Sequence, residues 1–419
     1  DGHVSAMKYW SSVGAVLSGM AIAQAIPVLG SLVIARLYAP SDFGAFSAWL
    51  GLVLFCAVVL TGRFETTLAI VEDGEPRKVA VLATLTTSFL SCAVLSVVVL
   101  AAYFLLPSLH GIAPALLMVF VPAALLTAVA QIWQSWAAAD GEYRLLSGMR
   151  IVQALGVICI QIAVGLFAPN PTTLVLGHTL GLLIGVCFGA YWRPLAIPSL
   201  KDAKPKILAF WLRYRRFPLL SLPADAINSA SAQLPMLLIA SKFGVEAAGF
   251  FALAMRVLGA PIGLLGAAVR DVFKRSAAAN YRKNGNCKED YIRTFYVLAT
   301  GGALLSIGVM LFAEPFFVLA FGESWRKAGQ FAFWLMPMFA LRFVASPLSY
   351  VLYIAEKQHV DLCWQCFLLL ITLSSFIFIP VMEQSIKVYA LSYSFLYLIY
   401  LWLSYSFSKN KISSFYKKI

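Results

Sequence analysis

The stretch ARLYAPSDFGAFSAW, Ala35–Trp49, has a related copy, ASKFGVEAAGFFALA, at Ala240–Ala254. When the two are aligned without gaps, an alanine, an aromatic residue, a glycine and a phenylalanine recur in the same order. A weaker copy, FGESWRKAGQFAFW, begins at Phe321. The pattern indicates an internal repeat whose two halves open with the same motif, and chance similarity between helix starts rich in Phe and Gly is the alternative.

The composition places both halves in a bilayer. Of 419 residues, 61% are hydrophobic and 12% are charged, and the mean hydropathy is +0.83. A membrane-spanning helix needs about 20 apolar residues, and runs of that length recur along nearly the whole chain. We therefore predict an all-α integral membrane protein with about twelve transmembrane helices. The expected ranges are 13–35, 43–70, 80–106, 114–138, 147–168, 172–192, 218–241, 246–272, 292–313, 328–354, 360–380 and 386–407.

The basic residues predict the orientation. If the N-terminus is cytoplasmic, three quarters of the 32 Lys and Arg residues fall on the cytoplasmic side, most of them in the loop 193–217 and in the segment 270–293. The opposite side would hold only Arg36, Lys242, Arg326, Lys327 and Lys387. This asymmetry favours two cytoplasmic termini and an even number of helices. It also accounts for the net charge of +13, so nucleic-acid binding is not expected.

The repeat and the helix count together predict two six-helix lobes, residues 7–200 and 201–419, joined by the cytoplasmic loop 193–217. Because six helices separate the copies, both lobes would start on the same face, as in transporters built from parallel repeats. Pro27 in the first expected helix has counterparts in Pro223 and Pro235 of the seventh. Prolines interrupt helical hydrogen bonding, so we expect these three positions to act as hinges around a shared cavity.

No metal site, cofactor site or disulfide framework is expected. The cysteines fall mostly in apolar spans, where a thiol behaves as a small hydrophobic group. CWQC at Cys363–Cys366 has metal or redox spacing but stands alone, so packing is the preferred interpretation. Residues 1–6 precede Met7, a candidate native start, and are left out of the functional interpretation, and the first apolar span is expected to be retained rather than cleaved.

Two longer stretches resemble bacterial polysaccharide transporters, the Wzx-type O-antigen flippases. The first joins ARLYAPSDFGAFSAWLGLVLF to TGRFETTLAI, and the second is LAFGESWRKAGQFAFWLMPMFALRFVASPLSYVLYIAEKQ, which ends at Gln358. The resemblance implies the multidrug/oligosaccharidyl-lipid/polysaccharide exporter fold, with the lobes forming a V around a central cavity. It implies that undecaprenyl-pyrophosphate-linked oligosaccharide moves from the cytoplasmic to the periplasmic leaflet of the bacterial inner membrane. Membrane lipids, a polysaccharide polymerase and chain-length machinery are the implied partners.

Deep arginines are the expected pyrophosphate ligands, since arginine can donate bidentate hydrogen bonds to phosphate. At about 1.5 Å per residue, Arg256 and Arg342 lie near the middle of a core about 30 Å thick. Charged residues at such depth normally face protein or water and mark a pathway. The alternative is a structural ion pair between helices, for instance with Asp225.

Asp225 and Glu65 are the acids expected within the membrane. Either carboxylate could take a proton and couple transport to a gradient, or simply balance an arginine. Arg63 and Glu65 are two residues apart, and on a helix that spacing turns the side chains by about 200°. We therefore expect them not to neutralise each other on one face. Arg63 is a candidate contact for incoming pyrophosphate at the cytoplasmic mouth, with snorkelling to headgroups as the alternative.

Three rival classes are weighed against this interpretation. A drug or cation antiporter of the same fold would be expected to carry an acid in helix one, and residues 13–35 have none. A polysaccharide polymerase or ligase would need a sizeable external loop and catalytic groups, whereas the expected external connections are short. A peptidoglycan lipid flippase usually has two further helices. We therefore expect a transporter rather than an enzyme.

Overall fold

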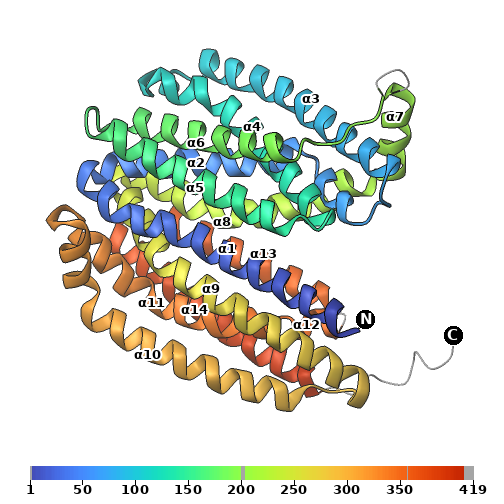
Figure 1. The fold of residues 1–419 in the computed structure, drawn as a ribbon. Coiled ribbons are helices and arrows are strands. Elements are labelled where there is room, and N and C mark those ends of the chain that lie inside the picture. Colours follow the sequence, from blue (N-terminus) through green and yellow to red (C-terminus); the bar gives the residue numbers. More distant parts are fainter. Residues whose placement is uncertain (1, 200–202, 356, 410–419) are drawn as a thin grey trace. The chain divides into compact units, whose positions relative to one another are not determined.

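A computed structural model describes residues 2–199, 203–355 and 357–409, and every regular element in these ranges is a helix (Figure 1). The predicted all-α class is confirmed. In chain order the elements are α1 (Gly2–Leu37), α2 (Pro40–Leu60), η1 (Phe64–Ala69), α3 (Glu75–Leu105), η2 (Pro107–Gly111), α4 (Pro114–Ala139), α5 (Tyr143–Gly165), α6 (Pro171–Trp192), α7 (Ala203–Arg213), η4 (Phe217–Ser221), α8 (Leu222–Phe243), α9 (Val245–Asn284), α10 (Lys288–Phe321), η5 (Glu323–Trp325), α11 (Arg326–Leu348), α12 (Val351–Ile354), α13 (Gln358–Ile377) and α14 (Met382–Lys409).

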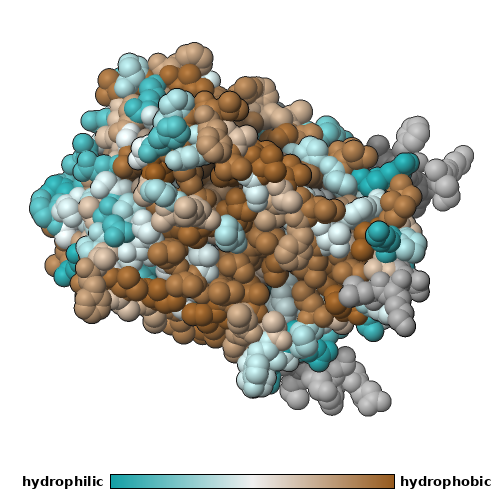
Figure 2. Space-filling view, turned by 90° about the horizontal axis from the view of Figure 1, so that it is seen from above, coloured by the Kyte–Doolittle hydropathy of each residue, from teal (hydrophilic) through white to brown (hydrophobic). Residues whose placement is uncertain are grey.

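Eleven helices among the described residues are long and apolar enough to cross a membrane. The seventh expected span corresponds to α8, which forms but does not reach that apolarity, because Asp225, Asn228 and Gln233 lie along it. Large apolar side chains are exposed on the outer helices, among them Phe104 of α3 and Leu319 of α10. Figure 2 shows apolar residues over much of the visible surface. The chain is a multi-pass membrane protein.

The chain divides into two compact units, Asp1–Leu237 and Leu238–Ile419. α7 and most of α8 belong to the first unit. The predicted lobes, 7–200 and 201–419, are defined by the sequence repeat and stay a prediction.

In the first unit, glycines allow α5 and α6 to pack closely. A β-carbon added at Gly181 of α6 would lie 2.3 Å from the backbone nitrogen of Val157 in α5, and one added at Gly185 would lie 2.7 Å from the Gln153 β-carbon. Small residues at such positions let membrane helices approach each other. At one end of this unit a buried cluster joins η1, α3, α4 and α7, with Phe64, Trp133, Trp136 and Phe210 among its members.

In the second unit, α11 packs against α9, α10 and α14. Its side chains Leu335, Met336 and Phe339 are almost fully buried. α14 supplies a row of buried tyrosines, in which the rings of Tyr389 and Tyr393 lie 4.6 Å apart between centroids. This helix is therefore held by aromatic packing as well as by aliphatic contacts.

The expected hinge prolines occupy different helical environments. Pro27 lies inside α1 and Pro235 inside α8. Pro223 is instead the second residue of α8, a helix that begins directly after the π-helical turn of η4. Their hinge role stays a prediction.

Candidate functional site

The site is built on a break in the chain after α2. The helix expected at 43–70 forms as α2, but its expected end is wrong, because α2 ends at Leu60 and the chain turns before η1. Gly62 has φ +57° and Arg63 has φ +63°, and Arg63 is the only described non-glycine residue with positive φ. The left-handed conformation costs a residue with a β-carbon about 1–2 kcal/mol. Such strain is tolerated where neighbouring contacts fix the backbone.

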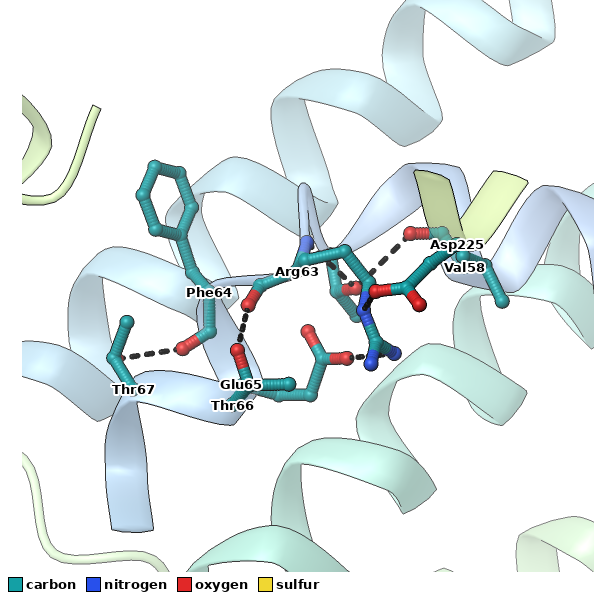
Figure 3. Close-up of polar contacts among 8 residues, drawn as sticks. Val58, Arg63, Phe64, Glu65, Thr66, Thr67 and Asp225 are labelled. Carbon is teal, nitrogen blue, oxygen red and sulfur yellow. Dashed lines mark hydrogen bonds and ion pairs between the residues drawn. The ribbon is translucent and has the colours of Figure 1, made fainter. Parts of the chain in front are cut away.

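Threonine hydroxyls fix this turn. Thr61 Oγ1 donates to the Val58 carbonyl and accepts from the Arg63 backbone N–H at 3.3 Å. Thr66 Oγ1 donates to the Arg63 carbonyl at 2.6 Å, and Thr67 Oγ1 donates to that of Phe64. The backbone at Arg63 is therefore bonded from both sides, which holds its side chain in one direction (Figure 3).

Arg63 contacts two carboxylates. Its Nη1 donates to Glu65 Oε1 at 2.7 Å, and its Nε lies 2.7 Å from Asp225 Oδ2 in α8. The side chain of Glu65 is 4% exposed, that of Arg63 24% and that of Asp225 39%. One cation thus meets two anions at the edge of a buried region, and Figure 3 shows Arg63 between them.

The expectation about Arg63 and Glu65 is corrected. Arg63 and Glu65 were expected on different helix faces, but they form an ion pair because the segment is not an α-helix. Asp225 forms an ion pair with Arg63, and the alternative in which Asp225 pairs with a deep arginine stays a prediction. The other oxygen of the Glu65 carboxylate, Oε2, is buried and has no hydrogen-bond partner among the described residues.

α7 supports the site from a segment expected to be plain loop. Phe210 packs on Phe64 with ring centroids 5.5 Å apart, and Trp211 Nε1 donates to Thr87 Oγ1 at 3.0 Å. Lys206 pairs with Glu75. The loop 193–217 therefore contributes a helix that packs against both η1 and α3. Sequence reasoning missed this helix.

The two deep arginines belong to the second unit. Arg256 is half-buried in α9, whereas Arg342 is exposed on α11. Arg342 is close enough to Tyr389, Tyr393 and Tyr397 of α14 to interact with them electrostatically. The structure thus brings together Arg63, Glu65 and Asp225, while the roles of Arg256 and Arg342 as substrate ligands stay predictions.

Within the described residues, no group of three His, Cys, Asp or Glu side chains could hold a metal ion. Cys363 and Cys366 are exposed on α13, a helix long and apolar enough to cross a membrane. The indole of Trp364 between them is buried and donates to the Leu396 carbonyl at 3.0 Å.

Comparison with known proteins gives a family. The model of a family described as "Polysaccharide biosynthesis protein" matches residues 33–330. The teichuronic acid biosynthesis protein TuaB of Bacillus subtilis (strain 168) is 24% identical over 250 residues, which cover 59% of this chain and 50% of TuaB. The match therefore spans half the length of that relative.

Solved structures show the same fold. A multidrug resistance MATE family transporter of the MOP superfamily, in an inward-facing conformation, matches with a TM-score of 0.66 and 13% identity over 90% of this chain and 93% of that one. The lipid II flippase MurJ, in an inward closed conformation, matches with a TM-score of 0.72 and 12% identity over 93% of this chain and 87% of that one. The predicted exporter fold is confirmed.

Proposed function

The chain belongs to the polysaccharide biosynthesis protein family, and we propose that it flips undecaprenyl-pyrophosphate-linked oligosaccharide from the cytoplasmic to the periplasmic leaflet of a bacterial inner membrane. Three findings support this: the family, the fold shared with MATE transporters and MurJ, and the similarity to a teichuronic acid biosynthesis protein. Movement would follow alternating access of the two lobes, with Pro27, Pro223 and Pro235 as hinges and both termini cytoplasmic.

The observation that carries the proposal is the fixed Arg63. Its guanidinium donates a hydrogen bond to Glu65, which is buried, and forms an ion pair with Asp225, which is more exposed. The Nε that faces Asp225 has no hydrogen-bond partner among the described residues. A pyrophosphate, like a carboxylate, can present two oxygens to a guanidinium, and it carries more charge, so it can replace Asp225 on Arg63. In the predicted topology Arg63 lies near the cytoplasmic mouth. The substrate would meet Arg63 first and Arg256 and Arg342 deeper in its path.

Displacement of Asp225 from the guanidinium by pyrophosphate would also leave the Asp225 carboxylate without its cation. A carboxylate released from arginine inside a partly buried site is stabilised by taking a proton. Asp225 and Glu65 are therefore the proposed coupling groups, and Glu65 Oε2 already lacks a donor among the described residues. Binding of pyrophosphate and uptake of a proton would then be linked through the same guanidinium.

The test is the leaflet distribution of the substrate in the native host. Lipid-linked oligosaccharide is metabolically labelled, and the fraction open to an impermeant glycosidase is measured on spheroplasts. Deletion of the chain should leave the label protected on the cytoplasmic leaflet, and re-expression should expose it. Normal exposure in the deletion strain, with polymerisation alone failing, would show that the chain acts after flipping.

A further inference from the structure

A groove of about 810 Å³ lies in the second unit, apart from the site at Arg63. It is found where α10 ends and where α11 and α14 begin, which is the external side in the predicted topology. Its lining combines two classes of side chain. The polar ones are Glu314, Arg326, Gln330 and Glu383. The apolar ones are Met310, Leu311, Ala313, Pro315, Val318, Leu319, Phe333 and Trp334.

Ion pairs fix the charged side chains of the groove. Arg326 bonds both oxygens of Glu323, at 2.6 and 2.9 Å, and bonds Glu314 of α10 at 2.8 Å. Lys387 pairs with Glu383 and lies 5.0 Å from the centre of the Trp334 ring. Three carboxylates therefore face two cations, and both cations are already engaged. A phosphate group would find no uncompensated positive charge here.

The backbone brings these groups close together. A β-carbon at Gly329 of α11 would lie 2.8 Å from the Glu314 α-carbon, so only a glycine lets α11 approach α10 at this height. Pro315 has no N–H, which removes the normal helical donor to the Leu311 carbonyl on the groove wall. The result is a shaped groove with fixed acceptors rather than a gap between loose side chains.

This chemistry matches a saccharide. Carboxylate and amide oxygens accept from hydroxyls, a guanidinium and an amide nitrogen donate to them, and aromatic rings cover apolar sugar faces. The lipid side of the groove is apolar and open, with Leu311 66% and Leu319 79% exposed. A ligand with a hydroxyl-rich head and a hydrocarbon tail satisfies both parts, as a pocket of mixed lining requires.

We infer that this groove binds the saccharide headgroup of the translocated lipid on its exit side; this rests on the proposed flippase function. Arg63 would hold the pyrophosphate at entry, and the groove would recognise sugar hydroxyls after crossing. The two sites differ in what they recognise: charge at Arg63 and hydroxyl pattern at the groove.

Photocrosslinking in the native host tests this. p-Benzoyl-phenylalanine is placed at Leu319 on the groove rim, and at Ile307 on the exposed part of α10 outside the groove lining as the control. After irradiation, the adducts on the purified chain are identified by mass spectrometry. We expect sugar-containing adducts at Leu319 and phospholipid adducts alone at Ile307. Phospholipid alone at Leu319, or no adduct there, overturns the inference.

Second-site variants test the contacts themselves. Glu314→Gln and Gln330→Ala should each lower the yield of sugar adduct at Leu319 about fivefold, the effect of losing one hydrogen bond worth about 1 kcal/mol. Gln384→Ala, exposed on α14 outside the groove lining, is the matched control and should leave the yield unchanged. Equal yields in all three variants contradict the assigned contacts.

The outcome separates this inference from the flippase proposal. If sugar adducts form but the leaflet distribution of lipid-linked oligosaccharide does not depend on the chain, the groove binds sugar and the flippase proposal is wrong. If only phospholipid adducts form but the leaflet distribution does depend on the chain, the flippase proposal stands and the groove does not bind sugar. A polyprenyl group on the adduct identifies the lipid-linked form, and a sugar adduct without it identifies finished polysaccharide.

Discussion

The Arg63 guanidinium and the Asp225 carboxylate lie 2.7 Å apart and join the turn after α2 to the first turns of α8. The same guanidinium holds Glu65, so one side chain links a strained turn, a buried acid and a helix distant in sequence. A change at any of the three residues should therefore alter the other two.

Replacing Arg63 should affect stability and transport separately. Arg63→Gln leaves the buried Glu65 charge uncompensated and should lower stability by about 2–3 kcal/mol, less than the full cost of a deeply buried pair because Arg63 is partly exposed. The double variant Arg63→Gln/Glu65→Gln removes that charge and should recover most of the thermal stability, measured in detergent by fluorescence-detected size exclusion. Surface polysaccharide should stay absent in both. Normal polysaccharide in the double variant would give Arg63 a structural role only.

Asp225 should matter for coupling more than for folding. Its side chain is 39% exposed, so Asp225→Asn should change stability by less than about 1 kcal/mol. Transport into inverted vesicles should lose its dependence on an imposed pH gradient, because the side chain no longer titrates. Asp225→Glu keeps a titrating group and serves as the control. If transport by Asp225→Asn still responds to the pH gradient, Asp225 is not the coupling residue.

The turn itself can be tested at Gly62. Its φ of +57° is costly for any residue with a β-carbon, although the nearest atom to an added one is 3.4 Å away. Gly62→Ala should therefore lower stability by about 1–2 kcal/mol through backbone strain alone. Gly263→Ala in α9, where an added β-carbon meets nothing within 4 Å, should be neutral or stabilising. Equal melting temperatures for the two variants would show that the turn adjusts freely.

Close packing of α5 and α6 predicts a larger effect at Gly181. A β-carbon there would lie 2.3 Å from a backbone nitrogen, so the helices must separate. Gly181→Ala should cost about 1–3 kcal/mol and reduce the folded fraction in membranes. Gly308→Ala, at an open position of α10, is the comparison. A wild-type melting curve for Gly181→Ala would indicate that this interface is loose.

Cys287 should resist alkylation. It lies between α9 and α10 with 1% exposure, and burial, with a contribution from Asp290, raises the pKa of its thiol to about 11. A raised pKa keeps the thiol protonated, so about one molecule in ten thousand carries the reactive thiolate at pH 7. Maleimide labelling should remain slow up to pH 9 and become fast on unfolding. Glu289→Cys, at an exposed neighbouring position, is the labelling control, and rapid labelling of Cys287 at pH 7 would mean that this end opens.

The helical class could be predicted because apolar runs of membrane length leave few other folds. The end of α2 could not, since the chain becomes apolar again at 68–71 and Gly62 is the one residue that signals a turn. α7 had a readable signal: Ile207, Phe210, Trp211 and Tyr214 follow helical spacing, and all four belong to or pack against the buried cluster at η1. The many basic residues around them favoured a solvated loop instead. The contact from Arg63 to Asp225 depends on tertiary packing, which no local pattern encodes.

The polarity of α8 bears on how the protein is made. A helix with Asp225, Asn228 and Gln233 partitions poorly into lipid alone, since each such group is costly without a partner. Arg63 lies beside Asp225, and Gly51 of α2 leaves room for Gln233. We therefore expect α8 to leave the insertion machinery late, after the preceding helices have assembled and can supply partners for its polar side chains. Biogenesis of the second half would then wait on correct assembly of the first.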